Sequence, residues 1–453
     1  YDYKSRYFGE FTFGYNGSER FSKNKRWGFF PSGAVGWMIS NESFFEPLKK
    51  VLTQFKLKGT YGMSGQDQIG NANDRFYYLS QVDMNASRPV NWGTQLNYNP
   101  GGINVSRYAN NEIGWETSYK MNLGFEATTS FGLSATVEYF TERRKNILLD
   151  RVIPNTMGII PAVKANLGRA KGNGVDMEVN FEKSVSKDLW FTGRGTFTYA
   201  TSEAVEWEEP DYSATPWLYK VGQSLGQTWG YIAERLFVDE EEVKNSPTQF
   251  GEYMAGDIKY RDVNKDGKIS ELDKVPIGYP TTPEINYGFG LSAGYKGFDA
   301  SFFFQGSARQ SFWLDLKKIT PFIDGDAGEN GNDGKTGQNA VLDVIANSYW
   351  SESNRNPYAF WPRLANQSIS NNTQTSTWFM QDATFLRLKS VELGYTLPSA
   401  FTKKYKVQNL RFYVSGTNLL CWSKFKLWDP EMAGNGLGYP VQRVINVGLN
   451  IGF

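Results

Sequence analysis

One segment of the sequence has residue types and a spacing that suit a bound cation. Residues 262–273 read Asp-Val-Asn-Lys-Asp-Gly-Lys-Ile-Ser-Glu-Leu-Asp. This order matches a calcium loop in which positions 1, 3 and 5 supply side-chain oxygens, position 6 is a turn glycine, position 7 supplies its carbonyl and position 12 supplies a carboxylate. The sequence therefore predicts a structural Ca²⁺ site with the ligands Asp262, Asn264, Asp266, Lys268 and Asp273.

Two features narrow the interpretation of this loop. Asp273 stands where such loops usually carry the longer Glu, and no amphipathic helices flank the segment as they do in calcium sensors. We therefore expect a structural calcium site that fixes the loop conformation, and not a calcium sensor that changes conformation on binding. The alternative is a turn rich in Asp, Asn and Gly that binds no ion.

Aromatic side chains are frequent in the long segments between the predicted strands. Such rings can stack on sugars or pack against peptide side chains, which makes them candidates for contact with a substrate or a partner. They can equally pack the loops against one another, because Trp and Tyr are also common in interfaces. The candidates are Trp207, Tyr212, Trp217, Trp350, Trp361 and Trp378.

The composition argues against an enzyme and against a nucleic-acid-binding protein. The 453 residues include no His, which excludes histidine-based catalytic triads and His-ligated zinc. The 48 Lys and Arg residues balance 47 Asp and Glu residues, so the net charge of +1 gives no basic surface for nucleic acid. With Cys421 as the only cysteine, an internal disulfide is impossible.

The elements that would position these residues are β-strands. At the C-terminus, Val441, Ile445, Val447, Leu449, Ile451 and Phe453 share one face, and small or polar residues fill most of the other. Residues 285–295 and 298–305 alternate in the same way around a tight turn at 296–297. We predict about 12 spanning strands by this template, with a β-bulge near Lys389 or Ser390 that reconciles two phases of alternation.

The connections between these strands differ systematically in length. Tight connections near residues 130, 186 and 296 would lie at one end, and long gaps at the other. This pattern is typical of bacterial outer-membrane barrels, which have short periplasmic turns and long extracellular loops. The predicted extracellular loops are about 16–27, 64–112, 146–171, 204–283, 308–383 and 420–440, and the glycine-rich stretch 324–334 is expected to be a flexible part of one of them. The prediction is an all-β transmembrane antiparallel barrel in contact with a lipid bilayer.

Several phrases, in this order, resemble the SusC-like or RagA-like family of TonB-dependent outer-membrane transporters. The resemblance spans nearly the whole chain. The matching phrases are residues 14–21, 27–32, 166–168 with 174–176, 256–264, 385–389 with 393–398, and 418–420 before 429–431.

This resemblance implies a 22-stranded barrel whose lumen is closed by an N-terminal plug, as in other barrels of this size. Residues 1–453 would be its C-terminal portion, with the plug and about 10 strands lying outside this chain. It further implies import of oligosaccharides or oligopeptides, a SusD-like surface lipoprotein that acts as a lid, and energy from the TonB-ExbB-ExbD complex through the N-terminal region.

Two other functions fit parts of the pattern. A self-contained barrel of about 12 strands would act as a passive porin and would conduct ions without a partner. A soluble calcium-binding lectin or adhesin built from β-sandwiches would also contain many strands. Its strand exteriors should carry more Lys and Glu than residues 285–295 and 445–453 do.

Overall fold

The fold is described by a computed structural model. It describes residues 1–69, 75–86, 91–98, 101–159, 161–322, 339–402, 404 and 406–453. Parts of three predicted loops (64–112, 146–171 and 308–383), including the glycine-rich stretch 324–334, lie outside these residues. No helix among the described residues combines the length and the apolar character that crossing a membrane requires.

The largest element is an antiparallel sheet with the strand order β1-β2-β3-β4-β7-β8-β9-β10-β15-β16-β19-β20-β21. Thirteen strands take part, and β1 has only two residues. The other twelve have between 9 residues, in β21, and 21 residues, in β9. These lengths suffice to cross the apolar part of a bilayer, because a tilted strand needs about 9–11 residues. The predicted number of long strands is therefore confirmed.

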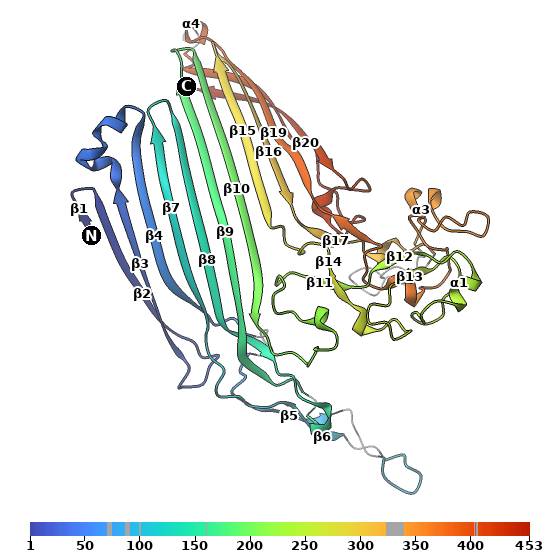
Figure 1. The fold of residues 1–453 in the computed structure, drawn as a ribbon. Helices are drawn as coiled ribbons and strands as arrows, with labels where there is room; N and C mark the ends of the chain where they lie inside the picture. The colour runs from blue at the N-terminus through green and yellow to red at the C-terminus, as the bar shows by residue number, and fades with distance from the viewer. Residues whose placement is uncertain are drawn as a thin grey trace. The chain divides into compact units, whose positions relative to one another are not determined.

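The chain divides into two compact units, and the first contains residues 1–177, 200–211 and 219–225. In this unit the long strands lie side by side, with η1 and η2 at one strand end and β5 and β6 at the other (Figure 1). Its elements are β1 (Asp2–Tyr3), β2 (Tyr7–Gly17), β3 (Trp27–Met38), η1 (Ile39–Asn41), η2 (Ser43–Lys50), β4 (Leu52–Gln66), β5 (Gln81–Ala86), β6 (Gly102–Arg107), β7 (Glu116–Thr129), β8 (Leu133–Asp150), η3 (Asn155–Met157) and most of β9 (Lys164–Ser184).

The second unit contains residues 178–199, 212–218 and 226–453. Here β15, β16, β19 and β20 lie side by side, and the short elements between them gather at the strand end away from α4 (Figure 1). Its elements are most of β10 (Leu189–Glu206), η4 (Pro216–Leu218), β11 (Thr228–Gly230), β12 (Ala233–Leu236), α1 (Glu240–Lys244), β13 (Ile258–Tyr260), η5 (Glu271–Asp273), β14 (Val275–Ile277), β15 (Ile285–Tyr295), β16 (Phe298–Ala308), β17 (Ser311–Trp313), α2 (Leu316–Ile319), α3 (Asp343–Asn347), η6 (Ser370–Thr373), β18 (Met380–Asp382), β19 (Phe385–Thr396), α4 (Ser399–Thr402), β20 (Asn409–Ser423), η8 (Pro430–Met432) and β21 (Val444–Gly452).

The strand ends shorten one of the predicted loops. β8 continues to Asp150 and β9 begins at Lys164, so the connection is 151–163 rather than 146–171. The prediction was wrong at both edges because it required apolar alternation. At the ends of these strands the Lys164 ammonium lies 2.6 Å from the Asp150 carboxylate, an ion pair that the template of alternating apolar residues does not detect.

The predicted bulge is confirmed in β19. The register shifts between Leu388 and Ser390 against β20, and the same residues shift against β16. Lys389 is therefore the extra residue. Because side chains alternate with a period of two, one extra residue returns Val391 and Leu393 to the apolar face that Leu386 and Leu388 occupy before it.

Candidate substrate-binding region

The strands of each unit have one apolar face and one polar face, and the polar face carries paired charges. In the first unit, the ammonium group of Lys58 lies 2.8 Å from the carboxylate of Glu126 and also contacts Glu138. In the second unit, Arg411 donates from Nε to Asp299 at 3.0 Å and also contacts Glu392. A polar interior facing a lumen is the usual arrangement in outer-membrane barrels.

The long connections of the second unit form a hydrophobic core of their own. Tyr231, Leu236, Ile258 and Ile345 are completely buried in it. Segments from three connections contribute to the core, namely those that follow β10, β16 and β20. The described parts of these connections therefore form a packed body, the loop body.

A buried carboxylate lies within this loop core. Asp257 is completely buried, and its side chain accepts hydrogen bonds from the Met254 N–H at 2.9 Å and from the Asn372 amide at 2.8 Å. The Arg363 guanidinium lies 2.9 Å away. Burial raises the pKa of Asp257, although the hydrogen bonds and the nearby guanidinium act in the opposite direction. Asp257 thus joins the connection that follows β10 to the connection that follows β16 through one charged group.

A pocket of about 470 Å³ opens in the same loop body. Trp313 and Phe379 contribute aromatic surface, while Asp315, Lys317 and Gln374 contribute charged and amide groups. The pairing of β17 with β18 brings its two sides together, because Trp313 is the cross-strand partner of Met380. A pocket with aromatic surface and a few polar groups suits an organic ligand that has both hydroxyl or amide groups and apolar faces.

The sequence interpretation missed this pocket. Trp313 lies at the end of a three-residue strand that is too short to show alternation. The available signal was the phrase Ser-Phe-Trp-Leu-Asp-Leu-Lys at 311–317. Two aromatic residues are followed there by charged residues that alternate with leucines, within one predicted loop.

The predicted calcium loop adopts a tight, internally hydrogen-bonded turn. The carboxylate of Asp262 accepts from the N–H groups of Lys265 at 2.6 Å and Gly267 at 2.8 Å. Asp266 accepts from the Lys268 N–H at 2.9 Å. Gly267 has a φ of +86°, a left-handed conformation that glycine adopts at little cost. The turn geometry expected of a glycine at position 6 is therefore present.

The last predicted ligand has a clear structural role. Asp273 is completely buried and accepts from the N–H groups of Val263 at 2.9 Å and Ser270 at 2.8 Å, which closes the loop and caps η5. Across the described ranges, no group of three or more Asp, Glu, Cys or His side chains forms a metal-binding cluster. Calcium binding would use the lone pairs of Asp262, Asn264, Asp266 and Asp273 that these hydrogen bonds leave free, together with the predicted Lys268 carbonyl. The site remains a prediction.

Two of the six candidate aromatic residues are core residues. Trp350 and Trp361 are each 6% exposed, and Trp361 packs against Phe379 with ring centroids 5.1 Å apart. A Cβ on Gly256, whose φ is +85°, would lie 2.3 Å from the Trp350 ring. Glycine at 256 therefore permits the ring to pack directly on the backbone. These contacts support loop packing for both tryptophans.

The other four candidates are partly exposed. The indole N–H of Trp378 donates to the Phe360 carbonyl at 3.2 Å, and that of Trp217 donates to the Leu272 carbonyl at 2.8 Å. Trp207 lies under the ammonium group of Lys220 at 6.0 Å, and Tyr212 lies nearby in the chain, before η4. The structure does not gather these residues around one cavity among the described pockets.

A buried arginine connects two of the phrases that carry the family resemblance. Arg387, in the phrase 385–389, is 2% exposed and lies 2.6 Å from Asp429 and 2.8 Å from Glu431. Asp429 and Glu431 belong to the phrase 429–431 in the connection between β20 and β21. The ion pairs hold this connection against β19. The two phrases therefore supply the two sides of one buried contact.

Long antiparallel strands with one apolar and one polar face, joined by short turns and by long folded connections, define a membrane β-barrel architecture. Solved structures of the RagAB peptide transporter have this fold: one matches 99% of this chain and 46% of its own with a TM-score of 0.72 at 22% identity. Another, of the importer in its open-open state, matches 100% of this chain and 45% of its own with a TM-score of 0.71 at 24% identity.

Sequence relatives are named as TonB-dependent receptors. TonB-dependent receptor P3 of Formosa agariphila is 26% identical over all of this chain and 44% of its own length. TonB-dependent receptor SusC of Bacteroides thetaiotaomicron is 25% identical over all of this chain and 43% of its own length. No family model matches the sequence. The chain thus spans less than half the length of the curated relatives it matches.

These comparisons confirm the predicted resemblance to SusC-like TonB-dependent transporters. They also confirm the expected fold class, the C-terminal part of such a barrel, and its location in the outer membrane. The relatives are named as receptors and transporters, which agrees with the expectation that the chain is not an enzyme.

Proposed function

We propose that this chain is part of a TonB-dependent importer that takes up oligosaccharides or oligopeptides across the outer membrane. The observation that carries the proposal is similarity over the whole chain to receptors named as TonB-dependent. The polar strand faces and the pocket of about 470 Å³ among the loops are compatible with passage and capture of a polar, partly apolar solute. A SusD-like lipoprotein over the loops and the TonB-ExbB-ExbD complex are the proposed partners.

The loop pocket is the proposed first contact for the substrate. Trp313 offers an aromatic surface, and Asp315 and Lys317 offer opposite charges beside it. Such a combination serves both substrate classes, because sugar rings stack on indole and peptide termini pair with charged groups. Loss of these groups should weaken capture without changing the barrel, since they lie outside the large sheet.

The test is uptake by cells that express the full-length protein. Labelled oligosaccharide and oligopeptide pools are supplied with TonB present or deleted. We expect accumulation of one pool only when TonB is present, and reduced accumulation at low concentration for Asp315→Ala combined with Lys317→Ala. Lys244→Ala in α1 is the matched control outside the pocket. Equal accumulation with and without TonB, together with constitutive ion conductance of the purified protein, would favour the porin instead.

A further inference from the structure

The apolar face of the second unit contains a trough that crosses five neighbouring strands. The cross-strand partners Ala293 on β15 and Ala300 on β16 form its floor. The same row continues through Leu393, Val414 and Val447 on the next strands. Two alanines side by side leave a depression because their neighbours along each strand are much larger. The resulting cavity has a volume of about 560 Å³.

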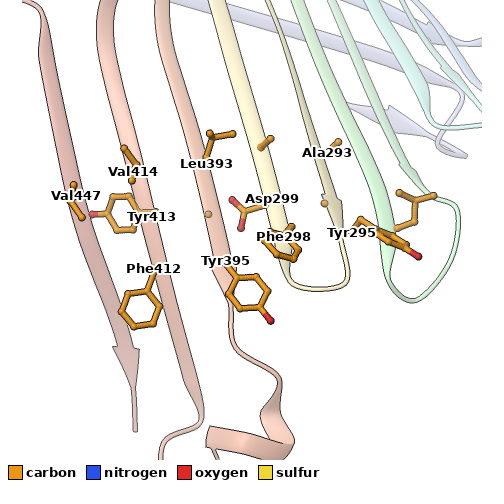
Figure 2. A pocket seen from close by; sticks show the side chains of 14 residues that line it. Ala293, Tyr295, Phe298, Asp299, Leu393, Tyr395, Phe412, Tyr413, Val414 and Val447 are labelled. Atoms are coloured by element: carbon orange, nitrogen blue, oxygen red, sulfur yellow. The ribbon is translucent and has the colours of Figure 1, made fainter.

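Large side chains border the trough on both sides. Toward the short turns, Tyr295, Phe298, Tyr395 and Phe412 form the adjacent cross-strand row, and Figure 2 shows their rings lining the edge. Phe298 and Tyr395 contact each other with centroids 4.3 Å apart. Toward the strand centres, Leu291 and Phe302 are cross-strand partners. Aromatic rows of this kind mark the interface between the hydrocarbon and the headgroups.

Cationic side chains stand at the turns just beyond the aromatic row. Lys296 is exposed in the turn between β15 and β16, and its ammonium group lies 5.2 Å from the Tyr295 ring centroid. Lys187 is exposed in the turn before β10. The two turns are joined by a hydrogen bond of 3.1 Å from the Lys296 N–H to the Asp188 carbonyl. An apolar trough is thus followed by an aromatic edge and then by turns that carry two lysines and one exposed acidic residue, Asp188, a net positive charge.

We propose that this trough is a binding site for one anionic phospholipid, with an acyl chain over Ala293 and Ala300 and the phosphate near Lys296 and Lys187. The order of groups matches the order along a phospholipid from acyl chain to headgroup. The short-turn end of an outer-membrane barrel faces the periplasm, so the lipid belongs to the periplasmic leaflet. Charge complementarity selects an anionic headgroup, because lysines beside a membrane attract anionic lipids.

The test measures lipid retained by the full-length protein. The protein is reconstituted in vesicles of equal phosphatidylglycerol and phosphatidylcholine and extracted in mild detergent. Bound lipid is then counted by native mass spectrometry. We expect one retained phosphatidylglycerol in the wild-type protein. Ala300→Phe, which fills the trough, should abolish it. Lys187→Glu combined with Lys296→Glu should reduce the preference for phosphatidylglycerol by at least about fivefold per lysine.

Ala135→Phe is the matched control. Ala135 pairs with Ala127 on the apolar face of β7 and β8, so this change fills an alanine pair of the same kind elsewhere. It should leave the retained lipid unchanged. The double lysine variant changes only exposed turn residues and keeps the test valid if Ala300→Phe assembles poorly. Three results would overturn the proposal. The first is lipid retention that neither variant changes, the second is no preference for the anionic lipid, and the third is a second copy of the chain bound in place of lipid.

Discussion

Asp257 shows how much one side chain contributes to the loop body. Its carboxylate receives hydrogen bonds from Met254 and Asn372 and lies beside Arg363, so residues distant in sequence meet at one buried charge. A buried charge is costly unless it is compensated, and removal of one partner leaves the other without compensation. We therefore expect the order of the loops to depend on Arg363.

Arg363→Met should destabilise the loop body by up to about 3 kcal/mol at neutral pH, because it leaves the Asp257 carboxylate without its cation. The measurement is hydrogen exchange of the backbone amides in residues 254–260. Arg261→Met is the matched control, since Arg261 forms an exposed ion pair with Glu234. That change should cost at most about 0.5 kcal/mol. Equal exchange in the two variants would contradict the prediction.

The pH dependence of the Arg363→Met variant follows from the raised pKa of Asp257. Since the folded pKa lies above the unfolded value, the folded state binds the proton more tightly, and stability rises as pH falls through the folded pKa. Loss of Arg363 raises that pKa further. The difference in exchange between variant and wild type should therefore shrink on acidification. A difference that grows at acidic pH would mean that Asp257 is not the responsible group.

The calcium prediction rests on Asp266. Asp266→Asn keeps an oxygen that can accept from the Lys268 N–H, so the turn should survive, but it removes a negative charge that calcium requires. We expect calcium titration calorimetry to show binding in the wild type and much weaker binding in the variant. Chelation should accelerate proteolysis within residues 237–283 of the wild type only. Proteolysis that is insensitive to chelator would show that the loop is held by its hydrogen bonds alone.

The stability of the strands in a membrane depends on keeping apolar and polar residues on opposite faces. Two adjacent residues of β16 allow the two faces to be compared directly. Phe302 lies on the apolar face near the strand centre, while Ser301 lies on the polar face opposite Glu392. The bulge at Lys389 keeps β19 in phase with this pattern. A charged side chain should therefore be tolerated at position 301 and be destabilising at position 302, one residue further along the strand.

Phe302→Arg should destabilise the assembled protein by about 2–4 kcal/mol, because it places a cation in the hydrocarbon region. Ser301→Arg, one residue away, should have little effect because Glu392 is its cross-strand neighbour. Urea titration of the protein folded in lipid vesicles measures both. Similar losses for the two variants would show that the face assignment is wrong.

The whole molecule combines two units, each of which contains membrane strands and folded connections. Its relatives are more than twice as long as the part they share with this chain. The proposed transport and partner binding would therefore belong to the complete assembly. We infer that the loop bodies, which are ordered by their own core, present a stable surface to a partner at the cell surface.

Purification of the native outer-membrane complex tests this inference. We expect the denatured complex to contain a lipid-modified companion in addition to a transporter subunit about twice as long as residues 1–453, as the resemblance implies. Mass spectrometry of every polypeptide provides the measurement. A single chain of 51.3 kDa with no companion would favour a self-contained porin.

Local patterns were enough to predict the long strands, the bulge at Lys389 and the resemblance to SusC-like transporters. Alternation with a period of two and ordered phrases are properties of contiguous residues. They did not reveal the pocket at Trp313, the pairing of Arg387 with Asp429, or the burial of Trp350. Each of these depends on contacts between connections that are distant in sequence, and such contacts are decided by packing in three dimensions. The trough over Ala293 and Ala300 likewise exists only because strand register places two small residues side by side.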